Sequence, residues 1–217
     1  MIDSRIQAVL NFVEKNSRVA DVGTDHGYLA IELVKNSVAS HVVASDLNSA
    51  PLDAAKKNIA AAGLSDFIET RLGDGLKVLR EGEVDTICIA GIGGALIAEI
   101  LNESPQVLKS TNQLILQPMN AIEKLQAWLI NNNWYMADIE LAEVGGIIYE
   151  IISAVKDSAK VAAVTKKEKS PLLKKFTAQK ISKFQRVLDE MSKSPAAVQS
   201  EKFRQIQAEI KALGKRQ

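Results

Sequence analysis

The chain has 217 residues, of which 47% are apolar and one is cysteine, and its formal net charge is +1. This length allows one ordinary domain and a small extension. The single cysteine excludes a disulfide framework and favours a reducing compartment, the cytoplasm. The apolar runs are shorter than the about 20 residues that cross a membrane, and MIDSRIQAVLNFVEKN has the pattern of an amphipathic helix (1–16), unlike a signal peptide. We therefore expect no membrane partner.

The small net charge conceals an uneven distribution. Residues 156–217 carry 16 Lys/Arg against 6 Asp/Glu, whereas residues 1–155 carry 11 against 20. A basic tail thus follows an acidic globular part. Clustered Lys and Arg indicate an extension that binds a polyanion. The alternative is a lysine-rich helical surface whose charges are merely solvated.

Strand-like and helix-like segments alternate up to about residue 155. The predicted strands are 18–23, 41–46, 66–74, 84–91, 112–118, 134–144 and 146–155. The predicted helices between them are 27–36, 50–63, 94–104 and 121–132. This alternation predicts a parallel, doubly wound α/β sheet. Gly145 and Gly146 between the last two strands predict an antiparallel hairpin at its edge.

The composition changes after Val155. Residues 156–171 are polar and lysine-rich, which indicates a linker. Apolar residues then recur at three- and four-residue steps before and after the break SKSP (192–195). This pattern predicts two amphipathic helices in an antiparallel hairpin. We therefore predict two domains, residues 1–157 and 158–217.

The segment DVGTDHG, Asp21 to Gly27, lies where the first strand ends and a helix begins, the place where doubly wound sheets bind ligands. A dinucleotide loop needs G-x-G-x-x-G to hold a pyrophosphate. Here the spacing is Gly23-x-x-x-Gly27, and two carboxylates, Asp21 and Asp25, would repel a pyrophosphate. They suit a ligand with a cationic end, such as S-adenosylmethionine. The alternative is an ordinary glycine turn of an α/β protein.

Acidic residues also end the next two strands. Asp46 follows Gly23 by 23 residues, near the spacing at which a carboxylate binds ribose hydroxyls. Asp74, in Gly73-Asp74-Gly75, is placed to face an adenine amino group. Each alone has a simpler explanation, a helix N-cap and a turn. Acidic residues at the ends of three consecutive strands are a more specific signal than any one of them, and together they favour a cofactor site.

The ends of the fourth and fifth strands are candidates for the substrate side. Glycines from Gly91 to Gly94 would let a base or the methyl donor approach the backbone, and Gln117-Pro118 ends the fifth strand. The alternatives are close helix–strand packing and a simple strand end. His26 and His41 have no Cys/His cluster around them, so we expect no metal site.

Several motifs together resemble the bacterial tRNA (adenine-22-N1)-methyltransferase family, also called TrmK. They are, in order, DVGTDHGYLAIEL, GDGL, TICIAGIGGALIAEIL, LILQPMN and YEI. The resemblance covers about the first 155 residues. It implies a Rossmann-like seven-stranded methyltransferase sheet followed by a small all-α, coiled-coil-like helical hairpin. It also implies S-adenosylmethionine as cofactor, tRNA as partner, and N1-methyladenosine in the D-arm region as product. No obligate protein partner is implied.

Three positions depart from the family pattern. Gly27 stands where relatives often have Ala, and Ser45-Asp46 stands where they tend to have Gly-Glu, which keeps the carboxylate. Relatives usually have Asn directly after LILQP, whereas Met119 intervenes here before Asn120.

Three groups of residues form the predicted site. The predicted catalytic residues are Asp25, Gln117 and Pro118. The predicted cofactor-binding residues are Asp21, Gly23, Asp25, His26, Gly27, Asp46, Leu47, Gly73, Asp74, Gly75, Ala90, Gly91, Ile92, Gly93 and Gly94. The predicted RNA-binding residues are Lys166, Lys167, Lys169, Lys174, Lys175, Lys180, Lys183 and Arg186.

Two other functions remain open at this point. The same domain could methylate another RNA base or a small molecule, with the tail as an oligomerisation element. It could also be a non-enzymatic module that binds NAD. The missing third glycine and Asp25 argue against NAD, and the charge distribution argues against a free small-molecule substrate.

Overall fold

The computed structural model describes residues 3–162 and 165–214 and divides into two compact units, Met1–Lys166 and Lys167–Gln217. The segment after the sheet stays with the first unit. Lys160 Nζ lies 2.6 Å from Glu14 Oε1, and Lys166 Nζ lies 3.0 Å from Glu140 Oε2. The domain boundary at 157/158 remains a prediction, nine residues before the division that the contacts give.

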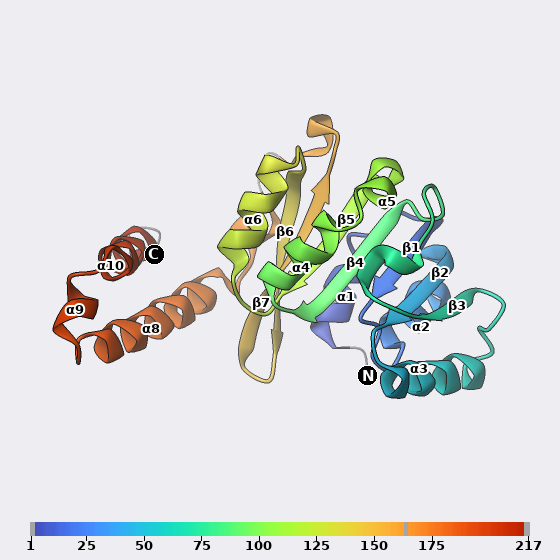
Figure 1. The fold of residues 1–217 in the computed structure, drawn as a ribbon, viewed down its shortest axis with the longest axis horizontal. Coiled ribbons are helices and arrows are strands. Elements are labelled where there is room, and N and C mark those ends of the chain that lie inside the picture. Colours follow the sequence, from blue (N-terminus) through green and yellow to red (C-terminus); the bar gives the residue numbers. More distant parts are fainter. Residues whose placement is uncertain (1–2, 163–164, 215–217) are drawn as a thin grey trace. The chain divides into compact units, whose positions relative to one another are not determined.

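A seven-stranded sheet forms the centre of the first unit (Figure 1). Its strands are β1 (Ser17–Val22), β2 (Ala39–Asp46), β3 (Ile68–Leu72), β4 (Thr86–Ile92), β5 (Gln113–Pro118), β6 (Tyr135–Val144) and β7 (Ile147–Val155). They lie in the order β3-β2-β1-β4-β5-β7-β6. The first five are parallel, β7 is antiparallel to β5, and β6 is antiparallel to β7. This confirms the predicted doubly wound sheet with an antiparallel final hairpin.

Helices cover both faces of the sheet. They are α1 (Ser4–Leu10), α2 (Tyr28–Lys35), α3 (Ser49–Ala61), α4 (Gly94–Asn102), α5 (Pro105–Ser110) and α6 (Ile122–Asn131), with 3₁₀ turns η1 (Gly75–Val78) and η2 (Ser158–Lys160). One core packs α1, α2 and α3 against the sheet, and a second packs η1, α4, α5 and α6 against the other face. Because both faces are covered, every residue of β5 is buried, as expected for a central parallel strand.

Glycines end the elements where the sequence predicts. Gly63 follows α3 with φ +69°, the left-handed conformation that ends many helices. Gly145 and Gly146 join β6 to β7 with φ +58° and +81°. Two consecutive residues with positive φ match the right-handed twist of a hairpin, so the predicted turn is confirmed.

The first helix is shorter than the predicted 1–16. It begins at Ser4 and ends at Leu10, and Asp3 caps it by accepting the N–H groups of Arg5 and Ile6. Asn16, with φ +65°, then directs the chain into β1. Helix α5 was not predicted, because its buried apolar residues are only Val107 and Leu108, too few to show a helical period.

The second unit contains the predicted helical hairpin. Its main helices are α8 (Leu173–Met191) and α10 (Glu201–Gly214), joined through α9 (Pro195–Val198) and preceded by α7 (Lys166–Lys169). Helices α8 and α10 pack together, and Thr177, Leu188 and Ile206 are buried. Among residues 3–162 and 165–214, no helix is long and apolar enough to cross a membrane.

Candidate active site

The loop after β1 is bonded to the end of β2 through its backbone. Gly23 and Thr24 both donate their N–H groups to the Ser45 carbonyl oxygen, each at 2.9 Å. Gly23 has φ +75°, a conformation that glycine adopts without strain. In a dinucleotide loop such N–H groups point at the pyrophosphate. Here two of them are already satisfied by the protein.

Asp21 is buried beneath this loop. Its carboxylate accepts the Thr24 hydroxyl at 2.6 Å and the backbone N–H of Ala30 in the first turn of α2. The positive end of the α2 dipole, where a pyrophosphate would bind, is thus occupied by a carboxylate of the chain itself. Burial raises the pKa of Asp21 to about 6, against the lowering effect of these hydrogen bonds.

Substitution of Asp21 by Asn should change how stability depends on pH. The folded-state pKa of about 6 lies above the ordinary value of 3.8, so folding takes up a proton between these values. The wild-type protein should therefore lose stability relative to Asp21→Asn as pH rises from about 4 to 7, by at most ~3 kcal/mol. Urea denaturation of both proteins at several pH values measures this. A stability difference that stays constant with pH contradicts it.

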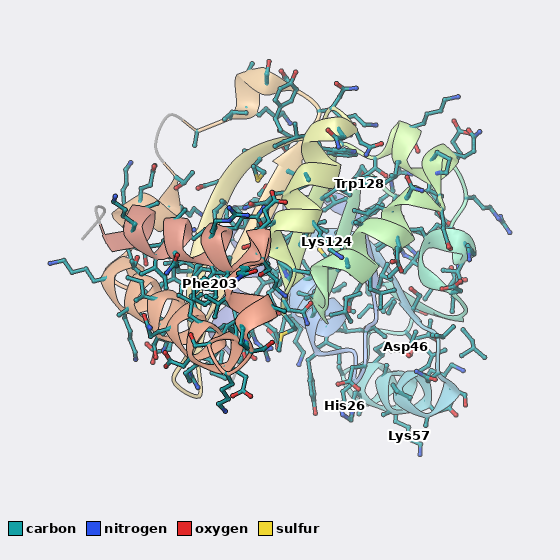
Figure 2. The ribbon with its side chains drawn as sticks, turned by 60° about the vertical axis from the view of Figure 1, so that its left-hand side comes forward. His26, Asp46, Lys57, Lys124, Trp128 and Phe203 are labelled. Carbon is teal, nitrogen blue, oxygen red and sulfur yellow. The ribbon has the colours of Figure 1, made fainter. Side chains whose placement is uncertain are left out.

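Asp46 and Asp25 meet at the ends of β2 and β1. Asp46 Oδ2 accepts the backbone N–H of Asp25 at 3.3 Å, and Oδ1 accepts that of Asn48 at 2.9 Å. Asp25 has φ +52°, and its side chain is 70% exposed, with Oδ1 3.6 Å from His26 Nε2. Figure 2 shows His26 and Asp46 at the same edge of the first unit, beside α3. The exposed carboxylate of Asp25 and the half-buried carboxylate of Asp46 therefore lie together at the carboxyl edge of the sheet.

A cavity of about 270 Å³ opens beside this loop. Its lining includes seven predicted site residues: Asp21, Gly23, Asp25, His26, Ala90, Gly91 and Gln117. It also includes seven that the sequence reasoning missed: Asp3, Arg5, Ile6, Val9, Thr24, Tyr28 and Leu29. Thr24, Tyr28 and Leu29 lie within or directly after the DVGTDHG motif, so proximity to it was an available signal. The four residues of α1 and its cap carry no such signal.

Gly27 lies next to the cavity lining but has a structural reason to be glycine. Its φ is +74°, and a Cβ would lie 3.2 Å from the Ala55 Cβ and 3.3 Å from the Ala55 Cα of α3. The Asn58 side chain of the same helix donates to the His26 carbonyl at 2.9 Å. Gly27 thus lets α3 approach the loop closely.

The remaining cofactor candidates lie outside the cavity lining. Gly73 N–H donates to the Asp46 carbonyl at 3.0 Å, which brings the Gly73-Asp74-Gly75 turn to the end of β2. Asp74 Oδ2 is 2.6 Å from Lys77 Nζ, which also pairs with Glu103 at 2.6 Å. Leu47 is 65% exposed beside Asp46. Their part in cofactor binding remains a proposal.

The ends of β4 and β5 are joined through Gln117. Its Oε1 accepts the Gly91 N–H at 3.1 Å, and its Nε2 lies 3.5 Å from the Met119 sulfur. Gln117 is buried, and Pro118 pairs with Ile92 in the sheet. A Cβ on Gly93 or Gly94 would lie 2.9 Å from Asn120 Oδ1 or 2.7 Å from the Ala121 carbonyl oxygen. These glycines therefore allow the segment after β5 to pack closely on the start of α4.

Seven of the eight predicted RNA-binding residues belong to the second unit. Lys174, Lys175, Lys183 and Arg186 are exposed on α8, and Lys169 is exposed on α7. Lys167 and Lys180 are half-buried over the rings of Phe176 and Phe184. Lys166 belongs to the first unit, where it pairs with Glu140 and lies over the Phe12 ring. Their contact with RNA stays a prediction.

The comparisons with known proteins agree with this geometry. Residues 2–152 match the methyltransferase domain family. The tRNA (adenine(22)-N(1))-methyltransferase of Bacillus subtilis is 37% identical over 153 residues, which cover 70% of this chain and 64% of that protein. With the strand order of its sheet, this match shows that the chain contains a methyltransferase domain of the Rossmann-like class.

Two solved structures extend the match over the whole chain. The B. subtilis m1A22 tRNA methyltransferase TrmK has a TM-score of 0.84 at 28% identity, covering 100% of this chain and 98% of that one. A putative tRNA (m1A22) methyltransferase of Streptococcus pneumoniae, solved in complex with S-adenosyl-L-methionine, has a TM-score of 0.81 at 30% identity, covering 100% and 99%. The chain belongs to the TrmK family.

Proposed function

We propose that this protein transfers the methyl group of S-adenosylmethionine to N1 of adenine 22, in the D-arm region of a tRNA, in the cytoplasm. The observation that carries the proposal is the loop after β1. Its N–H groups and the N-terminus of α2 are engaged by Ser45 and Asp21, which leaves an acidic edge suited to a cationic, phosphate-free ligand. The full-length likeness to tRNA m1A22 methyltransferases supports the RNA substrate.

The residues at this edge suit the parts of the cofactor. Asp46 would accept the ribose hydroxyls and Asp74 the adenine amino group, while Asp21 and Asp25 face the cationic end. The methyl donor supplies an electrophilic methyl group, and its displacement by a ring nitrogen needs no covalent enzyme intermediate. The chain then contributes positioning and electrostatics.

Asp25 is our candidate for acting on the base. N1 of adenine is a neutral nucleophile, and its methylation leaves a positive charge on the ring. The exposed Asp25 carboxylate would stabilise that charge or accept a proton from the exocyclic amine. N1 lies on the pairing edge, so the adenine must be unpaired before it reacts.

Gln117 and the backbone from Gly91 to Gly94 would hold the base. Gln117 Oε1 accepts the Gly91 N–H, and we assign the Nε2 donor of the same side chain to the base. Among the described residues its partner is the Met119 sulfur at 3.5 Å, a weak acceptor that a ring nitrogen of the adenine would replace. The family pattern has no Met at this position. In this chain the Met119 sulfur thus contacts Gln117 Nε2, the donor that we assign to the base.

The direct test uses labelled S-adenosylmethionine and unmodified tRNA. We expect one methyl group per tRNA, recovered as N1-methyladenosine at position 22. A matched tRNA with guanine at position 22 should accept none. Methylation that persists on this control tRNA contradicts the assigned nucleotide. Stabilisation by NAD but not by S-adenosylhomocysteine, measured by thermal shift, would favour a dinucleotide-binding module instead.

Substitution of Asp46 by Ala should weaken the binding of S-adenosylhomocysteine about tenfold or more. The change removes a charge-assisted hydrogen bond, which contributes roughly 1.5–3 kcal/mol. It also removes the acceptor that holds the Asp25 N–H. Isothermal calorimetry measures the affinity, with Asp53→Ala on α3, whose carboxylate pairs only with Lys56 among the described contacts, as the matched control. Unchanged affinity in folded Asp46→Ala protein would remove Asp46 from the site.

A further inference from the structure

Large apolar side chains are exposed along the carboxyl edge of the sheet. Leu72, Leu47, Leu96 and Met119 end or follow β3, β2, β4 and β5, and each is between 44% and 65% exposed. Leu47 is next to Asp46, and Leu72 pairs with Asp46 in the sheet, so these two lie beside the acidic residues assigned to the cofactor. Leu96, in the first turn of α4, and Met119, directly after β5, lie on the substrate side. We call Leu96 and Met119 the apolar ledge.

Backbone hydrogen bonds hold the two parts of the ledge together. The Met119 N–H donates to the Ile92 carbonyl at 2.9 Å, and the Gly94 N–H donates to the Asn120 carbonyl at 2.9 Å. Leu96 lies two residues after Gly94, within the same helical turn. Helices α4 and α6, which follow β4 and β5, pack side by side (Figure 1). Because the two segments are joined through their backbones, one frame presents both side chains of the ledge.

The ledge adjoins the cavity beside the β1 loop but does not line it. Gly91 and Gln117 line the cavity at the same strand ends, whereas Leu96 and Met119 lie outside the lining. The Met119 sulfur is 3.5 Å from Gln117 Nε2, the donor that we assign to the target adenine. An adenine that reaches the cofactor must enter the cavity, so the ledge is left for a different part of the RNA.

The two segments that meet at the ledge carry no charge. Residues 86–98 and 110–122 contain no Lys, Arg, Asp or Glu, whereas the cavity lining contains Asp3, Asp21 and Asp25. A phosphate would meet no cation on these segments and would be repelled by the carboxylates of the adjoining cavity. The face of a nucleobase is neutral, and a thioether packs favourably against an aromatic ring. The ledge thus suits a base rather than the phosphate backbone.

We propose that Leu96 and Met119 pack against the face of the nucleobase next to the target adenine in the tRNA chain. This contact orients the RNA so that the target adenine enters the cavity at Gln117. Methionine at position 119, where the family pattern has none, supplies a flexible and polarisable surface for the base. The inference rests on the proposed function, because it takes an adenine of the RNA as the methyl acceptor.

The first measurement is tRNA affinity at several salt concentrations, for wild-type protein and for the variant with Leu96→Ser and Met119→Ser. Loss of the apolar contact should weaken tRNA binding about tenfold. The slope of log affinity against log salt should stay the same, because no phosphate contact is lost. Affinity for S-adenosylhomocysteine should also stay the same, which shows that the variant is folded. Ile130→Ser, at an exposed apolar residue in the last turn of α6, is the matched control and should change none of these quantities.

The second measurement is a double-mutant cycle with tRNAs that lack one base. Two tRNAs carry an abasic nucleotide, one on the 5′ side and one on the 3′ side of the target adenine. For one of them, we expect wild-type protein to bind about tenfold more weakly than it binds intact tRNA. The serine variant should lose no further affinity for that same tRNA. This non-additivity assigns the contact to the missing base.

Four other results would overturn the ledge. Unchanged tRNA affinity in the serine variant removes both side chains from recognition, and a smaller salt slope means that a phosphate binds there. Losses that add for both abasic tRNAs mean that the ledge contacts neither neighbouring base. Weaker binding of S-adenosylhomocysteine together with tRNA means that the two side chains only support the fold. Wild-type protein that binds S-adenosylhomocysteine but methylates no tRNA contradicts the proposed function itself, whereas wild-type protein that methylates adenine 22 leaves only the ledge at stake.

Discussion

Replacing Asp25 with Asn should lower the rate of methyl transfer by about two to three orders of magnitude, the usual cost of removing one electrostatic group that acts on the transition state. The affinities for S-adenosylhomocysteine and tRNA should change little. The reason is chemical. The base becomes positively charged as N1 is methylated, and the Asp25 carboxylate is the exposed acidic group of the β1 loop.

The backbone makes Asn the informative substitution. Asp25 has φ +52°, and Asn adopts this left-handed conformation more readily than most residues. Asn also keeps the side-chain shape and the Asp25 N–H that Asp46 accepts. Ala at this position would combine loss of charge with backbone strain, so its effect could not be assigned to either cause.

Single-turnover kinetics with saturating cofactor and tRNA isolates the chemical step. Near wild-type rates in Asp25→Asn would exclude a role in the transition state. A large loss of S-adenosylhomocysteine affinity would instead assign Asp25 to the cationic end of the cofactor. Asp53→Asn, on α3 away from the cavity lining, should leave both quantities unchanged.

Local sequence patterns were sufficient to predict the fold, because each pattern agrees with what the folded sheet, its helices or its turns require at that position. Apolar strands alternate with helices, and the chain therefore forms a parallel sheet covered on both faces. Gly63 and the Gly145–Gly146 pair have the positive φ that the predicted helix end and hairpin need. The end of α1 at Leu10 was not predictable, because the turn that follows is set by the packing of Val13 and by Asn16 rather than by periodicity.

The candidate site was predictable only where it lies close to a motif in sequence. Asp21, Asp25 and Asp46 end neighbouring strands, so the parallel topology alone brings them together. Arg5 was not selected for the cavity, because its position depends on the β6–β7 hairpin more than 130 residues later. The hydrogen bonds of the Gly23 and Thr24 N–H groups were not predictable either. Their acceptor is the backbone carbonyl of Ser45, which any residue type could provide.

A chain truncated after Lys166 should keep its affinity for S-adenosylhomocysteine and lose most of its affinity for tRNA. All the cofactor candidates precede residue 95, and the first unit has its own two cores. The cut removes 13 of the 27 Lys and Arg residues with only five Asp and Glu. Each lost phosphate contact lowers the slope of log affinity against log salt by roughly 0.7–0.9.

A second variant tests the charges without removing the hairpin. Gln at Lys174, Lys175, Lys183 and Arg186 changes four exposed positions on α8 and leaves the buried Leu188 and Ile206 in place. Those two side chains contribute about 1.5–3 kcal/mol each to the packing of α8 on α10, so circular dichroism should show an intact hairpin. We expect a salt slope smaller by up to about 3 and weaker tRNA binding at every salt concentration.

The two variants together separate three roles of the hairpin. If it serves only stability, the truncated protein should melt at lower temperature and lose cofactor and tRNA binding together, while the four Gln substitutions change nothing. If it serves only association between copies, truncation should change the size-exclusion volume and keep the salt slope per chain. If it binds RNA, both variants should keep the cofactor and lose salt-dependent tRNA affinity. A folded truncated protein with the full-length salt slope would instead assign RNA binding to basic residues of the acidic first unit, such as Arg5, Arg18 and Arg71.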